Sequence, residues 1–208
     1  GCENLKSISL LGDLAHIGER AFSECCSLIS INVDSDNKYY ADRNGVLFTK
    51  DFTTLVTYPA GKKTSTYNIP RGVTYIGAYA FESCNSLSSI TMPDGITRIG
   101  DYAFTGCSLS SVIIPKSVTD IGESIFAYCL NIKSVTIPES INRIPNKAFF
   151  RCHALKSISL QAITPAKLGR DVFAYTNAYI YVPPAALASY RNAPGWRDYA
   201  DMIKAMDG

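Results

Sequence analysis

The 208-residue sequence has little of what catalysis, nucleic-acid binding or membrane insertion requires. It contains only two histidines, His16 and His153, and no cysteine pair with the C-x-x-C spacing of zinc sites. Its 20 basic and 18 acidic residues leave a net charge of +2, which gives no strong attraction for nucleic acid or anionic membranes. No apolar run approaches the roughly 20 residues of a membrane-spanning helix. We therefore expect no nucleic-acid partner, no direct membrane insertion, no metal and no cofactor.

Residues that could carry chemistry are few and isolated. Asp34-Ser35-Asp36-Asn37 begins like a calcium loop, but the pattern fails at Lys38 and Tyr39, which favours a simple turn. Neither histidine has a nucleophile pattern nearby. We expect no catalytic residue, and a hydrolase is the weakest of our hypotheses because it would need a pair of carboxylates in a cleft.

What the sequence does contain is a repeat of 22 or 23 residues. A copy at 72–94 is followed by close copies at 95–116, 117–139 and 140–162, and weaker copies begin near Gly12 and Ile163. In each copy the apolar spacing changes from helix-like to the L-x-x-L-x-L pattern of a strand. One copy cannot enclose its own apolar residues, whereas copies stacked about 4.8 Å apart can. The sequence therefore predicts an α/β repeat, namely a right-handed leucine-rich-repeat solenoid of parallel strands and short helical turns.

Equivalent residues of successive copies should lie over one another. A phenylalanine stands four residues after a glycine in most copies, and we expect Phe81, Phe104, Phe126 and Phe149 to form one stacked column. Five cysteines lie three residues after the repeat phenylalanine, one in each copy, and are Cys25, Cys84, Cys107, Cys129 and Cys152. Because a thiol is a small apolar group with a weak donor, we expect reduced structural cysteines that fill the turns, with an occasional disulfide as the alternative. Cys26 is out of phase and is the candidate for a reactive thiol.

Two segments depart from the repeat. Between Phe22 and Phe81, residues 45–59 read as two β-rich runs around Lys50-Asp51-Phe52-Thr53, which predicts a β-hairpin within an insert at about 38–70. The hairpin should project from one coil or replace part of it. At the other end, residues 183–208 begin with prolines that suit helix starts, and Trp196, Tyr199, Ile203 and Met206 share a helical face. We expect a solenoid over 1–182 and a helical capping segment over 183–208.

The strands should expose two columns of small side chains. If their apolar residues face inward, then the alternate positions face outward and form an uncharged, hydroxyl-rich surface. Its members are Ser89, Thr91, Ser111, Ile113, Ser134, Thr136, Ser157 and Ser159. We predict that this surface binds a partner, with Tyr39, Tyr40 and Tyr58 around the insert as a second contact region or as packing residues.

The motif Ile-Gly-x-x-Ala-Phe-x-x-Cys-x-x-Leu-x-Ser-Ile-x-Ile-Pro resembles the BspA-like leucine-rich repeats of bacterial surface proteins. Residues 75–93 carry it whole, residues 45–51 resemble the hairpin insert of that family, and residues 193–196 resemble its closing segment. Departures such as Pro145 for glycine and Thr176 for cysteine affect packing more than function. The resemblance implies a surface or secreted location in bacteria and binding of a host or bacterial surface protein or a glycan, with no catalytic motif.

We therefore favour a non-catalytic binding or adhesion module. A structural spacer within a larger surface protein is the main alternative. The first residues, Gly1 to Ile8, match the second half of a repeat, so we expect further coils upstream. We expect the secretory signal and the anchor to lie outside these 208 residues, and we expect the chain on its own to be monomeric.

Overall fold

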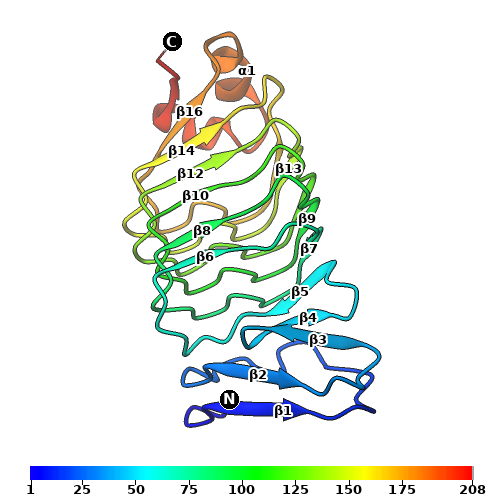
Figure 1. Ribbon diagram of the computed structural model, residues 1–208. Helices are drawn as coiled ribbons and strands as arrows, with labels where there is room; N and C mark the ends of the chain where they lie inside the picture. Colours follow the sequence, from blue (N-terminus) through cyan, green and yellow to red (C-terminus); the bar gives the residue numbers. More distant parts are fainter. Residues whose placement is uncertain (208) are drawn as a thin grey trace.

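The chain forms a solenoid in which successive coils stack along one axis. The computed structural model describes residues 1–207, and the two ends of the chain lie at opposite ends of the stack (Figure 1). One column of strands contains β1 (Ser7–Leu10), β2 (Ser30–Val33), β6 (Thr66–Asn68), β8 (Ser89–Thr91), β10 (Ser111–Ile113), β12 (Ser134–Ile137), β14 (Ser157–Leu160) and β16 (Tyr179–Val182). Ser134 lies opposite both Ser111 and Ser157 in parallel pairing. The predicted stacking of equivalent residues is confirmed.

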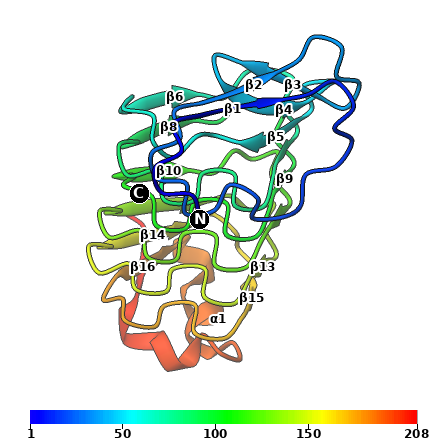
Figure 2. The ribbon, with the colours of Figure 1, turned by 90° about the horizontal axis from the view of Figure 1, so that it is seen from below.

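Each regular coil contains a second strand that the sequence analysis did not predict. This second column, on the opposite side of the coils (Figure 2), contains β5 (Thr54–Thr57), β7 (Tyr75–Ile76), β9 (Arg98–Ile99), β11 (Asp120–Ile121), β13 (Arg143–Ile144) and β15 (Lys167–Leu168). Most of these strands are two residues long, and β7 and β9 pair in parallel. Two residues are too few to show alternation, so no sequence pattern marks them.

The segments expected to be short helical turns are β-turns instead. The amide of Ala80 donates to the carbonyl of Gly77, and that of Cys84 to the carbonyl of Phe81, so the bonds span three residues. Tyr79 and Ser83 are left-handed, each with a φ of 58°. A left-handed residue at every fourth position prevents the i to i+4 bonding of an α-helix. The leucine-rich-repeat solenoid itself is confirmed.

A column of stacked phenylalanine rings runs through the core. Ring centroids of Phe81 and Phe104 are 5.1 Å apart, those of Phe104 and Phe126 are 5.5 Å apart, and those of Phe126 and Phe149 are 5.7 Å apart. Neighbouring planes in this column differ by 15° or less. These rings are fully buried, which confirms the predicted column.

The phased cysteines form a second column beside the rings. The thiol of Cys107 donates to the carbonyl of Phe81 at 2.8 Å, and the thiol of Cys129 donates to that of Phe104 at 3.0 Å. All seven cysteines are unpaired, Cys26 is exposed, and the phased ones from Cys25 onward are buried. The prediction of reduced thiols that serve the turns is confirmed, whereas the reactivity of Cys26 stays a prediction.

The insert replaces part of one coil and contains two hairpins. β3 (Tyr40–Arg43) and β4 (Val46–Thr49) are antiparallel, as are β4 and β5, and β5 then joins the solenoid by pairing in parallel with β7. The predicted hairpin around 50–53 is β4 and β5. The other one turns at Asn44 and Gly45, whose φ angles of 54° and 76° suit the Asn-Gly hairpin turn. The Asn-Gly dipeptide is a strong sequence signal for a two-residue hairpin turn, and the sequence analysis did not use it.

The C-terminal segment covers the last coil, but only part of it is helical. It contains a 3₁₀ turn at Pro184–Ala186, helix α1 (Leu187–Asn192), a second 3₁₀ segment at Arg197–Met202 and strand β17 (Ile203–Ala205). The indole N–H of Trp196 donates to the carbonyl of Ala166 at 2.7 Å, and its ring lies 6.0 Å from that of Phe173. Ile203 is not on the expected helical face because its strand pairs with β16. Across residues 1–207, no helix combines the length and apolarity needed to cross a bilayer.

Candidate binding surface

The strands β8, β10, β12 and β14 expose the predicted columns, which we call the hydroxyl face. It consists of Ser89, Thr91, Ser111, Ile113, Ser134, Thr136, Ser157 and Ser159, all exposed or half-buried. The alternation is sharp on β10, where Val112 is 3% exposed and the neighbouring Ile113 is 74% exposed. The structure therefore brings all eight residues onto one surface, and no charged side chain belongs to either column.

The hydroxyl groups of this face are unengaged. Within residues 1–207, none of its serine and threonine side chains makes a hydrogen bond to another protein group. Elsewhere on the solenoid the same groups connect the coils: the hydroxyl of Ser110 donates to the carbonyl of Ser88 at 3.1 Å, and that of Ser140 donates to the carbonyl of Val118 at 2.6 Å. The hydroxyl face thus retains donors and acceptors that a ligand can use.

The next coil extends the hydroxyl face with tyrosines that the sequence analysis missed. Tyr179 lies opposite Ser157, and Tyr181 lies opposite Ser159 and Lys204. The amino group of Lys204 lies 3.6 Å from the centroid of the Tyr179 ring. The alternation of Tyr179 and Tyr181 around buried Ile180 is the period-two pattern that would have identified both tyrosines.

The tyrosines around the insert do not form one contact region. Tyr58 is only 2% exposed, and its ring stacks on Phe81 with centroids 5.3 Å apart. It takes the place of the repeat phenylalanine in its coil, which agrees with the packing alternative and contradicts a role for Tyr58 in contacting a partner. Tyr40 is half-buried, and its hydroxyl accepts a hydrogen bond from the amide of Ile17 at 3.1 Å. Of the three, Tyr39 alone has half of its surface exposed.

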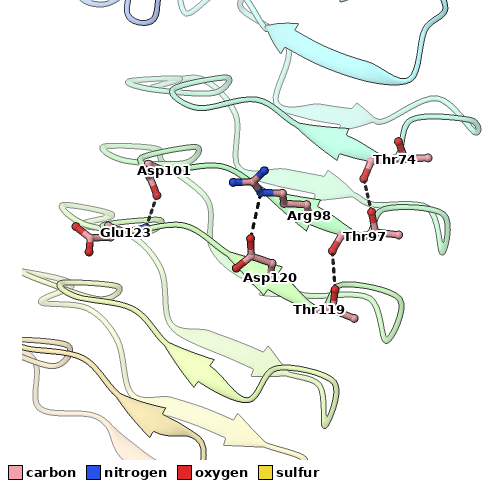
Figure 3. Close-up of polar contacts among 7 residues, drawn as sticks. All are labelled: Thr74, Thr97, Arg98, Asp101, Thr119, Asp120 and Glu123. Atoms are coloured by element: carbon pink, nitrogen blue, oxygen red, sulfur yellow. Dashed lines mark hydrogen bonds and ion pairs between the residues drawn. The ribbon is translucent and has the colours of Figure 1, made fainter.

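The opposite face, around β7, β9 and β11, uses its polar groups internally. The hydroxyl of Thr97 donates to the carbonyl of Thr74 at 3.2 Å, and that of Thr119 donates to the carbonyl of Thr97 at 3.4 Å (Figure 3). Arg98 and Asp120 form an ion pair of 3.1 Å, but both are more than half exposed, so solvent screens it and it contributes little stability. This face is a polar seam between coils rather than a set of free groups.

A cluster of aromatic rings lies on the turns of the later coils. The Phe150 ring is edge-on to the rings of Tyr128 and Tyr175, at centroid distances of 5.6 and 5.4 Å. The Arg151 guanidinium lies within 5.8 Å of all three ring centroids. The cation is therefore already paired with the rings, and the cluster stabilises adjacent turns.

The described groups offer little for catalysis or metal binding. Burial raises the pKa of the Cys152 thiol to about 12 and raises those of Cys107 and Cys129 well above their usual value. These thiols therefore stay protonated and non-nucleophilic at neutral pH. His16 and His153 are both exposed. Residues 1–207 contain no cluster of three or more His, Cys, Asp or Glu side chains that could hold a metal ion.

Comparison with solved structures places the chain among bacterial leucine-rich-repeat proteins. A leucine-rich repeat protein from Eubacterium ventriosum is 28% identical over 88% of this chain, with a TM-score of 0.77. A leucine rich cell surface protein from Faecalibacterium prausnitzii is 29% identical over 98% of this chain, with a TM-score of 0.70. The chain spans 52% of the length of each. The pneumococcal vaccine antigen PcpA, 21% identical over 99% of this chain and 57% of its own length, shares the fold with a TM-score of 0.70.

The repeat itself identifies the family. No curated protein matches the chain by sequence. The model of the BspA type leucine rich repeat region matches in six copies, over residues 1–44 and 59–179. These ranges cover most of the chain and leave out residues 45–58, which contain β4 and β5 of the insert. The chain therefore belongs to the BspA-type leucine-rich-repeat family.

Proposed function

We propose that this chain is a non-catalytic binding module of a bacterial surface or secreted protein, and that it recognises a protein or glycan through the hydroxyl face. The observation that carries the proposal is the contrast between faces. The hydroxyls of Ser88, Thr97, Ser110 and Ser140, outside the hydroxyl face, donate to carbonyls of neighbouring coils, whereas the hydroxyls of the hydroxyl face have no partner within residues 1–207. Unpaired hydroxyls on each of β8, β10, β12 and β14 support the proposal that this surface binds a ligand.

The chemistry of the face suits an uncharged polar ligand. A hydroxyl can both donate and accept, so it can match the hydroxyls of a sugar or the amides of a peptide. Exposed Ile113 in the centre and Tyr179 at the end add apolar area, and tyrosine is enriched at binding surfaces. Strand spacing repeats these groups at equal intervals, which favours an extended ligand that contacts several coils.

The surface location has separate support. The Faecalibacterium prausnitzii relative is described as a cell surface protein, and the proposal carries that location to this chain. The chain spans about half of that relative, so the location of the whole protein is part of what we propose.

The experiment is a binding screen followed by paired variants. The purified chain is applied to arrays of extracellular-matrix proteins and glycans, and each retained ligand is measured with Thr91→Lys plus Thr136→Lys. The matched control is Thr74→Lys plus Thr119→Lys, which adds the same charge to the opposite face. We expect the hydroxyl-face variant to weaken binding about tenfold or more while the control binds normally, because buried unpaired lysines oppose association.

Other outcomes separate the alternatives. Equal binding by both variants would discard the hydroxyl face as the binding surface. A chain that retains no ligand from either array would count against a binding module and favour the structural spacer.

A further inference from the structure

The solenoid has a recess where one coil lacks its outward turn. In the regular coil, four residues separate Ile76 from Phe81, and they include left-handed Tyr79. In the coil of the insert, only two residues separate Leu55 from Tyr58, although Leu55 pairs with Ile76 and Tyr58 occupies the phenylalanine position. The shorter path runs straight and leaves a hollow of about 210 Å³ between the turns on either side.

One wall of the recess has main-chain donors without partners. Three amides per turn, at alternate residues, normally donate to the next coil, as Tyr102, Phe104 and Gly106 do to Glu123, Ile125 and Ala127. The equivalent amides of the first turn belong to Arg20, Phe22 and Glu24. Among residues 1–207 these three amides have no acceptor, because the coil that should supply one is shortened.

The opposite wall has the complementary acceptors. The carbonyl of Ala80 accepts the amide of Tyr58 at 2.8 Å, as in a regular coil. The carbonyl of Ala78 has no donor in the described chain, and that of Glu82 receives only the long 3.9 Å contact from the Cys84 thiol. Donors on one wall and acceptors on the other form the two edges that a peptide main chain can bridge.

The side chains agree with this reading. Ser23 and Glu82 occupy the same repeat position on the two turns that flank the recess, and both line it. In a regular coil, the hydroxyl at this position of Thr105 donates to the carbonyl of Ser124 in the next coil. Ser23 Oγ and Glu82 Oε2 are instead buried atoms without a hydrogen-bond partner in the described residues. Buried unpaired polar atoms are costly, and a ligand in the recess would remove that cost.

We propose that the recess binds a short peptide segment of a partner protein, whose main chain supplies the contacts of the missing turn. Alternate donors and acceptors match a main chain better than a small molecule. Arg20 and Tyr79 line the recess from its two walls, and the Arg20 guanidinium lies 5.3 Å from the centroid of the Tyr79 ring. The site lies on the turns rather than on the hydroxyl face, so it does not depend on the function proposed above.

The test uses a peptide that copies the regular turn. The probe is capped Gly-Ala-Tyr-Ala-Phe-Glu-Ser, the sequence of residues 77–83, titrated into the isotopically labelled chain. We expect saturable shifts at the amides of Arg20, Phe22 and Glu24, and slower hydrogen exchange there when peptide is bound. The same peptide with N-methyl groups on its tyrosine and serine should bind about tenfold more weakly, because it lacks the two main-chain donors that match the free carbonyls of Ala78 and Glu82.

Protein variants complete the design. Thr57 lines the recess, so Thr57→Trp should fill part of it and weaken peptide binding about tenfold. Thr97 lies outside the recess, so Thr97→Trp should leave peptide binding unchanged. If Thr57→Trp fails to fold, the N-methylated peptide still tests the main-chain contacts. The proposal is overturned if the peptide produces no shift at millimolar concentration, if shifts fall elsewhere, or if the N-methylated peptide binds equally well.

Discussion

The thiol of Cys152 donates a hydrogen bond to the carbonyl oxygen of Phe126, one coil earlier, at 3.0 Å. In the next coil the cysteine is replaced by Thr176, whose hydroxyl donates to the carbonyl of Phe149 at 2.9 Å. A different side chain thus makes the same bond. What the position requires is a small donor that reaches a buried carbonyl, not the reactivity of sulfur.

Removing that donor should destabilise the chain. We expect Cys152→Ala to lower the free energy of unfolding by about 1–3 kcal/mol, because it leaves the Phe126 carbonyl buried and unpaired. Cys152→Thr should lose much less, since threonine serves this position in the neighbouring coil. Urea unfolding at pH 7 measures both. Equal losses in the two variants would show that the hydrogen bond does not account for the cost.

Stability should fall in alkaline solution. Burial raises the pKa of the Cys152 thiol from its usual 9.0 to about 12 in the folded chain. Below pH 9 the folded and unfolded chains both keep this proton, so its contribution is complete. Above pH 9 the unfolded chain releases the proton more easily, and the free energy of unfolding falls by about 1.4 kcal/mol per pH unit for one thiol.

The alkaline effect can be assigned with the same variant. Unfolding of wild type and Cys152→Thr is compared at about pH 8, below both pKa values, and at about pH 11, which lies between them. We expect a shallower decline in the variant. Parallel declines would mean that Cys152 is not responsible, and the thiols of Cys107 and Cys129, whose pKa values burial also raises, would then be the next candidates.

The sequence was sufficient to predict the features that depend only on a residue's position within the repeat. Cysteines and phenylalanines recur at fixed positions, so their stacking into columns follows from the repeat alone, as the contacts of Phe104 and Cys129 confirm. The outward direction of Ser111 and Ile113 followed from strand alternation in the same way. Their role in binding stays a prediction.

Features set by tertiary contacts were not predictable. Tyr58 looked like one of several insert tyrosines, and only the shortened path from Leu55 places it in the ring column. Tyr79 and Ser83 are left-handed without being glycine, so no sequence signal revealed that the expected helical turn is a pair of β-turns. Ile203 pairs with β16 across the intervening helical segments, so no local sequence pattern marks its strand.

The ring column should contribute strongly to stability. Phe126 is fully buried between Phe104 and Phe149, so Phe126→Ala should lower the free energy of unfolding by about 3–5 kcal/mol. Tyr128, which is 48% exposed, provides the control, and Tyr128→Ala should cost less than about 1 kcal/mol. Guanidinium unfolding distinguishes them. Similar costs for both positions would contradict the central place of the column.

The repeat glycine should be required only where another coil packs against it. A Cβ on Gly122 would lie 2.3 Å from the amide nitrogen of Asp101 in the preceding coil, whereas a Cβ on Gly18 would have no atom within 4 Å. We expect Gly122→Ala to cost about 1–3 kcal/mol or more, because main chain must move. Gly18→Ala, at the same repeat position, should be close to neutral. Thermal unfolding of the two variants gives the comparison, and a neutral Gly122→Ala would refute the close packing.

The hydroxyl face is tested most directly by mapping a bound partner residue by residue. The isotopically labelled chain is titrated with a ligand retained in the array screen, and its amide resonances are followed. We predict that the largest shifts fall on β8, β10, β12 and β14, centred on Thr91, Ile113 and Thr136. Shifts centred instead on Thr74, Thr97 and Thr119 of the opposite face, with the hydroxyl face unchanged, would contradict the proposed binding surface.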